Sequence, residues 1–129
     1  MTAIFRESST STFPTEVQVR KADLSSLESL TNAFSGHDAV VCTIATSEAG
    51  NQKILADAAV AAGVKRFIPF EFGFNTRPGK ISHPVVETLP YMVAKKETVD
   101  HLEVLAAKNP GFTWTGLATN MWLDWVSLC

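Results

Sequence analysis

Lys95 is the residue of this 129-residue chain whose position best suits acid–base chemistry. On a helix that begins near Tyr91, residues three or four apart share a face. One apolar stripe therefore contains Tyr91, Lys95, Val99 and Leu102. Desolvation lowers the pKa of a buried lysine, which favours a general acid or base or a group that orients a ribose hydroxyl. The alternative is a lysine whose stem covers the sheet edge while its ammonium reaches water. Lys96 is expected to pair with Asp100 in solvent.

Arg6 and Asp23 each follow a predicted strand and could contact a ligand there. Arg6 ends an extended apolar run and precedes hydroxyl residues, an arrangement that accommodates a 2′-phosphate. A solvated arginine at a strand end is the alternative. Asp23 could accept a hydrogen bond from an adenine amino group, or it could be a turn or capping residue of the next helix.

Short apolar runs alternate with helical stripes along the chain. Strands are expected at 2–5, 17–20, 38–45, 66–70 and 112–118, and helices at about 25–34, 51–62 and 91–108. This alternation predicts an α/β fold, a doubly wound parallel sheet with ligands beyond the carboxyl ends of its strands. Ser25 and Glu28 suggest a capping box. The run 38–45 is apolar enough for a central strand covered on both faces, and residues 75–90 suggest a long ordered loop.

A glycine-rich phosphate turn, which such a sheet usually carries, is missing from this sequence. None of the seven glycines has the G-x-G-x-x-G spacing, and no room for it exists ahead of Thr2. The sequence therefore predicts a Rossmann-like sheet that lacks its first strand and its glycine-rich loop. The histidines and cysteines have no metal-ligand spacing, so no metal site is predicted.

The composition of the chain excludes some classes of binding partner. The chain carries 11 Lys+Arg and 13 Asp+Glu, a formal charge of −2, and 46% hydrophobic residues. One globular domain is expected, without the basic surface that binds nucleic acid or anionic membranes. Cys42 and Cys129 lie far apart, and the N-terminus has no signal pattern, so a reducing cytoplasmic location is expected.

Several segments together resemble the NmrA-like family of atypical short-chain dehydrogenases, which includes the isoflavone reductase-like enzymes, and most closely its fungal branch. The segments are TAIFR at 2–6, ADL at 22–24, DAVVCTI at 38–44, GVKRFIPFEFG at 63–73, the lysine helix, and NPGFTWT at 109–115. Their order and spacing cover nearly the whole chain.

The resemblance implies an NADPH-dependent reductase of a small aromatic or secondary-metabolite substrate. Lys95 matches the catalytic lysine of the family, and Arg6 matches the arginine that binds the 2′-phosphate. Tyr91 and Lys95 also reproduce a Tyr-x-x-x-Lys spacing, which carries less weight. The remaining cofactor-binding positions implied are Thr43, Ile44 and Ala45 beside the ribose, and Phe70, Glu71 and Phe72 at the nicotinamide.

Departures from the family pattern open alternatives. Phe70 stands where the family usually has serine, and residues 1–129 are expected to be a partial NAD(P)-binding domain without the C-terminal substrate-binding part. We therefore expect weak NADPH binding by this chain, if any. One alternative is a non-enzymatic regulator or dinucleotide sensor that binds a protein partner. The other is a truncated gene product with no activity of its own. Exposed sheet edges would then require a homo-oligomer or another partner.

Overall fold

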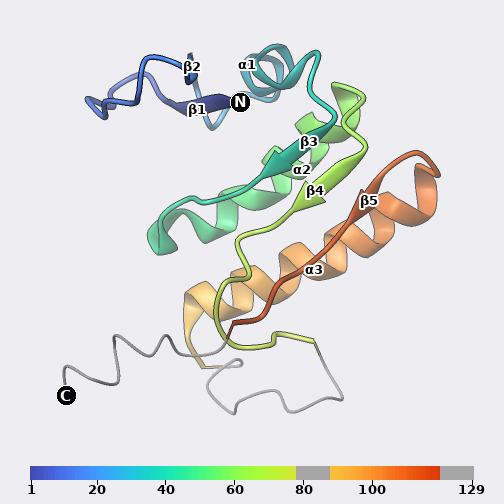
Figure 1. Cartoon of the computed structure of the whole chain (residues 1–129). Coiled ribbons are helices and arrows are strands. Elements are labelled where there is room, and N and C mark those ends of the chain that lie inside the picture. Colours follow the sequence, from blue (N-terminus) through green and yellow to red (C-terminus); the bar gives the residue numbers. More distant parts are fainter. Residues whose placement is uncertain (78–87, 120–129) are drawn as a thin grey trace, which may run out of the picture.

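The computed structural model describes residues 1–77 and 88–119, which form two small parallel sheets and the helices packed on them (Figure 1). The strands are β1 (Thr2–Arg6), β2 (Gln18–Ala22), β3 (Ala39–Val41), β4 (Arg66–Ile68) and β5 (Thr113–Trp114). The helices are α1 (Leu27–Phe34), the 3₁₀ helix η1 (Thr46–Asn51), α2 (Gln52–Ala61) and α3 (Pro90–Lys108). Most of the predicted loop 75–90 and the tail that holds Cys129 lie outside the described residues.

Both sheets are parallel, as the alternation of strands and helices predicts. One sheet has the order β1-β2 and the other the order β3-β4-β5. Doubly wound sheets have the order 3-2-1-4-5-6. The two sheets correspond to positions 3-2 and 4-5-6 of that order, and no strand of the described residues lies between β1 and β3. The predicted α/β class with parallel strands is therefore confirmed for this part of the chain.

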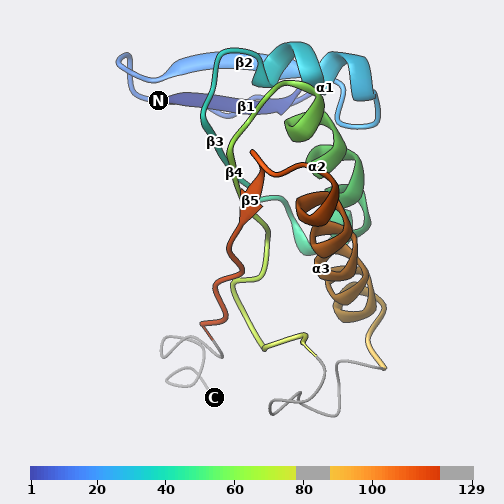
Figure 2. The same cartoon turned by 90° about the vertical axis from the view of Figure 1, so that its right-hand side faces the viewer.

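Helices α2 and α3 lie on the same side of β3-β4-β5, and α1 packs against α2 and β2 (Figure 2). The core between these layers is apolar, with Phe67, Leu30 and Leu102 each fully buried. The predicted stripe of α3 is confirmed, because Lys95, Val99 and Leu102 are all buried. No helix of the described residues is long and apolar enough to cross a membrane.

The cap of α1 differs from the prediction by one residue. Ser26, and not Ser25, is the N-cap, and its hydroxyl accepts a hydrogen bond from the backbone N–H of Ser29 at 3.2 Å. The Ser25 hydroxyl instead donates to the Asp23 carboxylate at 2.6 Å. Because Asp23 holds Ser25 in the preceding turn, the helix begins one residue later than the predicted capping box requires.

The central strand is also shorter and more open than predicted. β3 covers only Ala39–Val41 of the expected run 38–45, and Val41 is 56% exposed. Its pairing with β4 continues only through Cys42, whose N–H donates to the Ile68 carbonyl at 2.8 Å. Helices α2 and α3 both lie on one face of β3-β4-β5, and no described helix packs on the other face, so the prediction of a strand covered on both faces was wrong for the described residues.

Candidate active site

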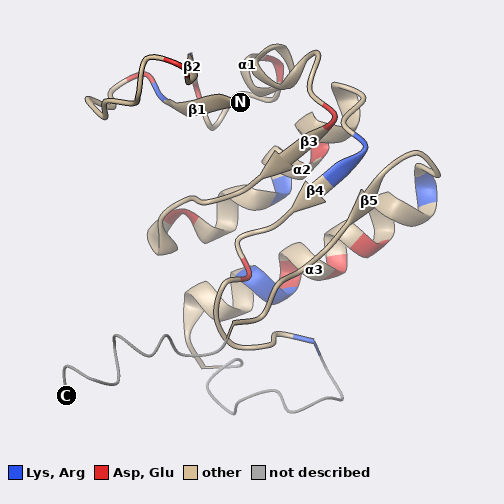
Figure 3. Ribbon diagram, in the orientation of Figure 1, with Lys and Arg blue, Asp and Glu red and all other residues tan. Residues whose placement is uncertain are grey.

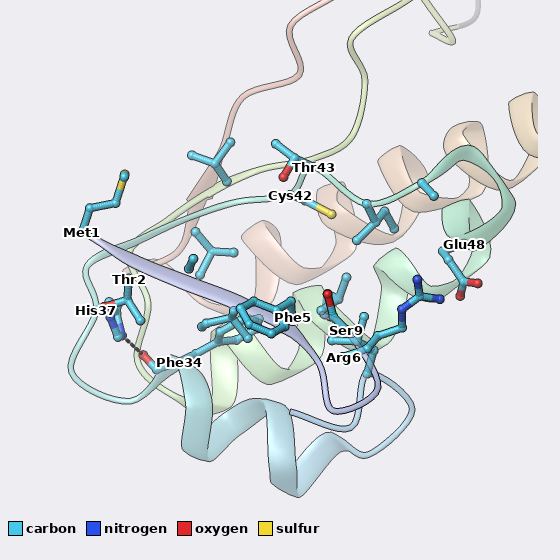
Figure 4. A pocket seen from close by; sticks show the side chains of 18 of the residues that line it. Met1, Thr2, Phe5, Arg6, Ser9, Phe34, His37, Cys42, Thr43 and Glu48 are labelled. Carbon is cyan, nitrogen blue, oxygen red and sulfur yellow. Dashed lines mark hydrogen bonds between the residues drawn. The ribbon is translucent and has the colours of Figure 1, made fainter. Parts of the chain in front are cut away.

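The structure divides the predicted site residues into two groups at the carboxyl ends of the strands. The first group lines a cavity of about 600 Å³ between β1 and the segment that follows β3 (Figure 4). It contains Arg6, Thr43, Ile44 and Ala45. The second group surrounds Lys95 where α3 passes the segment that follows β4. It contains Phe70 and Glu71.

Arg6 brings a cation to the cavity. The Ser9 N–H donates to the Arg6 carbonyl at 3.0 Å, and this turn places Ser9 along the same cavity. Within the described residues the Arg6 guanidinium makes no hydrogen bond or ion pair. Glu48 lines the same cavity, and its carboxylate accepts a hydrogen bond from Asn51 at 2.6 Å. Arg6 is therefore available to an anionic ligand, which fits the phosphate-binding interpretation.

Asp23 does not line this cavity. Its carboxylate accepts hydrogen bonds from the backbone N–H of Ser25 at 2.9 Å and from the Ser25 hydroxyl, and these bonds lower its pKa. Asp23 is exposed and acts as a turn residue ahead of α1. The structure thus supports the turn reading of Asp23.

Lys95 is buried, with only 3% of its surface exposed. Its ammonium nitrogen lies 4.1 Å from the centre of the Phe70 ring, within the range of a cation–π interaction. The backbone of Gly73 passes close by, since a Cβ at that position would lie 3.7 Å from Nζ. A lysine that reaches into water would be far more exposed, so the structure favours the desolvated reading. Tyr91 is half-buried one turn earlier on the same helix.

Glu71 is the second buried charge of this group. It is 4% exposed, and its Oε2 accepts a hydrogen bond from the Thr76 hydroxyl at 2.7 Å. Burial raises the pKa of Glu71, while the bond from Thr76 and the charge of Lys95 oppose that rise. Burial likewise lowers the pKa of Lys95, and the charge of Glu71 opposes that fall. Each group therefore favours the ionised form of the other.

Gln52 and Thr76 are two site residues that the sequence analysis missed. Gln52 is fully buried at the start of α2, and its Oε1 accepts a hydrogen bond from the Phe70 N–H at 2.6 Å. A polar residue on the buried face at the start of the predicted helix was the available signal. Phe72 packs edge-on against Phe70, with ring centres 6.5 Å apart. The backbone of Phe70 is thus fixed from α2, and its ring is held by Phe72.

Cys42 lies between the two groups, beside the backbone of Ile44 and Phe70. Burial raises the pKa of its thiol to about 11, so it is a buried apolar side chain rather than a nucleophile. No group of three or more His, Cys, Asp or Glu side chains in the described residues could hold a metal ion.

The fit to a dinucleotide is partial. Arg6 and Ser9 line the cavity and offer donors to a phosphate. Phe70 and Lys95 offer an aromatic face and a proton donor, but they do not line this cavity. No glycine lines the cavity, so the tight turn that brings backbone N–H groups to a pyrophosphate is not formed by the described residues that line it.

Comparison with known proteins places this arrangement in a family. The profile of the NAD(P)H-binding family matches residues 1–125. Oxidoreductase aprR of Aspergillus flavus is 41% identical over 127 residues, which are 96% of this chain and 40% of the relative. Oxidoreductase poxI of Penicillium oxalicum is 34% identical over 125 residues, 97% of this chain and 38% of the relative. The chain thus spans about 40% of the length of these curated relatives.

Solved structures show the same fold. An isoflavone reductase superposes with a TM-score of 0.68 at 23% identity over 91% of this chain and 40% of its own. The NADPH complex of leucoanthocyanidin reductase from Vitis vinifera has a TM-score of 0.64 at 21% identity over 80% of this chain and 32% of its own. Since the family profile covers nearly the whole chain, the protein belongs to the NAD(P)H-binding family and has the Rossmann-like fold of the isoflavone reductase-like proteins.

Proposed function

We propose that this chain is the cofactor-binding part of an NADPH-dependent reductase acting on a small aromatic or secondary-metabolite substrate. The observation that carries the proposal is Lys95, a buried ammonium held against the Phe70 ring at the carboxyl edge of β4. Buried lysines beside an aromatic wall are suited to proton transfer in a site that excludes water. The oxidoreductases that share 41% and 34% identity with the chain agree with this class of reaction.

Residues of the cavity would hold the cofactor. Arg6 and Ser9 would bind the 2′-phosphate, and Thr43, Ile44 and Ala45 would line the adjoining ribose. When bound, NADPH supplies the hydride. The protein's own part in the chemistry is to hold the proton at the Lys95 Nζ, with the nicotinamide pocket walled by Phe70, Glu71 and Phe72.

Turnover tests the role of Lys95. NADPH oxidation would be followed by absorbance with pinoresinol and an isoflavone as probe substrates, and Lys95→Met should lose about 10²- to 10⁴-fold in rate. The matched control is Lys96→Met, because Lys96 is the neighbouring lysine whose ammonium pairs with Asp100 at 2.9 Å in a surface ion pair. Equal losses in both variants, or full activity of Lys95→Met, would refute the assignment.

Cofactor affinity tests Arg6 separately. A charge-assisted hydrogen bond contributes about 1.5–3 kcal/mol, so Arg6→Ala should weaken NADPH binding roughly 10- to 100-fold while leaving NADH binding unchanged. Arg66→Ala is the control, because Arg66 is exposed and donates to the Thr115 hydroxyl at 2.9 Å, away from the cavity. Fluorescence titration of wild type also tests the expected weak binding, which a micromolar Kd would contradict.

A second function, binding of a protein partner, is favoured by the open edges of β1 and β3. Each strand pairs on one side only within the described residues, and the two edges face the same cavity. An extended apolar segment lying parallel to both would satisfy their free backbone groups. Hydrogen exchange tests this second function. Partner binding should protect the β1 and β3 amides from exchange, and the Lys95→Met variant should show the same protection as wild type.

We place the protein in the cytoplasm, in keeping with the buried free thiol of Cys42.

A further inference from the structure

Glu71 places an unusual charge in the interior. It is 4% exposed, and only one of its two carboxylate oxygens is hydrogen-bonded, the Oε2 that accepts from Thr76. The other oxygen, Oε1, is buried and has no hydrogen-bond donor among the described residues. A buried carboxylate with an unbonded oxygen is costly unless a cation lies close enough to compensate it.

Lys95 is the cation best placed for this role. The two described cations whose charge reaches Glu71 are Lys95 and Arg77. Arg77 is exposed, and its guanidinium stacks 4.8 Å from the centre of the Trp114 ring. Lys95 is buried, and its ammonium has no hydrogen-bond acceptor among the described residues. Figure 3 shows basic positions of α3 beside an acidic position of the segment that follows β4.

Four other charged side chains of α2 and α3 near Lys95 in the sequence or across the helix pair form ion pairs of their own. Lys53 of α2 and Glu97 of α3 form a surface ion pair at 2.6 Å, and Lys96 pairs with Asp100. Half-buried Tyr91 is the remaining titratable group on the same face of α3. The four ion-paired side chains are each at least 38% exposed, so water screens their charges. The Glu71 Oε1 and the Lys95 ammonium therefore each lack a hydrogen-bond partner among the described residues, and the charge of each group acts on the other.

We propose that Glu71 is a positioning residue for Lys95: its buried carboxylate supplies the opposite charge that holds the Lys95 ammonium against the face of Phe70. The inference rests on the proposed function, because a proton donor must be loaded before each transfer. Burial alone favours the neutral amine, which would have no proton to give. Glu71 supplies the opposing charge without an N–O contact inside 4.0 Å, so the ammonium keeps its donors free for a substrate.

NMR titration of the lysine ¹³Cε resonances tests the charge coupling without cofactor or substrate, with Lys95 assigned from Lys95→Arg. Glu71→Gln should lower the pKa of Lys95 by about one unit, the low end of the effect of a nearby opposite charge. The matched control is Glu97→Gln, which removes an exposed carboxylate two residues from Lys95 and should leave that pKa unchanged. An unchanged Lys95 in Glu71→Gln would overturn the proposal.

The reciprocal variant covers the case in which Glu71→Gln fails to fold. Coupling between two sites is mutual, so Lys95→Met should raise the pKa of Glu71, read from its ¹³Cδ resonance, by the same amount. An unshifted Glu71 in Lys95→Met would equally overturn the proposal. If turnover is found, Glu71→Gln should move the alkaline limb of the pH–rate profile to lower pH, and Glu71→Asp should restore it. Coupling without any turnover would refute only the reductase function.

Discussion

Replacing Phe70 by leucine should lower the pKa of Lys95. The Lys95 Nζ lies 4.1 Å from the centre of the Phe70 ring and in a buried setting, where a cation–π interaction is worth about 1–2 kcal/mol. Leucine keeps most of the bulk and removes the negative face of the ring, so the protonated lysine loses this attraction and the neutral amine does not. At 1.36 kcal/mol per pKa unit, the expected decrease is about 0.7 to 1.5 units.

The same ¹³Cε titration measures this change, with Phe72→Leu as the matched control. Phe72 is the aromatic neighbour that packs edge-on against Phe70, and among the described residues it makes no cation–π interaction with Lys95. Its replacement should move the Lys95 pKa far less. A smaller side chain at position 70 could instead admit water, which would raise the pKa by relieving desolvation. An unchanged or raised pKa in Phe70→Leu would therefore refute the argument that the ring stabilises the ammonium.

Four further predictions concern stability and reactivity. Leu102→Ala, at a fully buried position of α3, should reduce the free energy of unfolding in urea by about 2–5 kcal/mol. Ser26→Ala should cost about 0.5–2 kcal/mol in the same assay and Ser25→Ala much less, because Ser26 caps α1; the reverse order would contradict the cap assignment. The pKa of Glu71 is raised above its ordinary value of 4.5, so the folded chain binds the proton more tightly and stability should fall as pH rises through the folded pKa. Urea melts across that pH range should show the fall in wild type and not in Glu71→Gln. Cys42, with its pKa raised to about 11, should react with a thiol reagent at pH 8 only after urea unfolds the chain, and fast labelling of the native protein would contradict its burial.

Lys95 was predictable from the sequence because helical period alone fixes which residues share a face. The stripe that contains Tyr91, Lys95 and Leu102 needs no knowledge of the rest of the fold, and α3 begins and ends within one residue of the predicted helix. Parallel strands followed in the same way from the alternation of short apolar runs and helices. The cap of α1 was predicted one residue early because the competing bond from Ser25 to Asp23 cannot be read from the spacing of a capping box.

Glu71 and β3 show what local pattern leaves undetermined. Glu71 was expected as a cofactor contact, whereas its coupling to Lys95 depends on how the chain turns after Pro69 and on the Thr76 hydroxyl, five residues further along the chain. The exposure of Val41 depends on what covers the free side of β3, and apolar sequence alone does not supply a neighbour. Both properties are set by long-range packing.

The two halves of the site rest on different parts of the fold, so their properties should be separable. The Lys95 group is built by α3, the start of α2 and the end of β4, which share one packed core. The cavity that contains Arg6 lies between two sheets with no described strand joining them, so its width depends on how α1 packs against α2. A change that loosens this helix contact should weaken NADPH binding while the pKa of Lys95 stays as it is. Under the proposed function, proton donation then depends on the packing of the core, and cofactor affinity depends on how the two sheets are held apart.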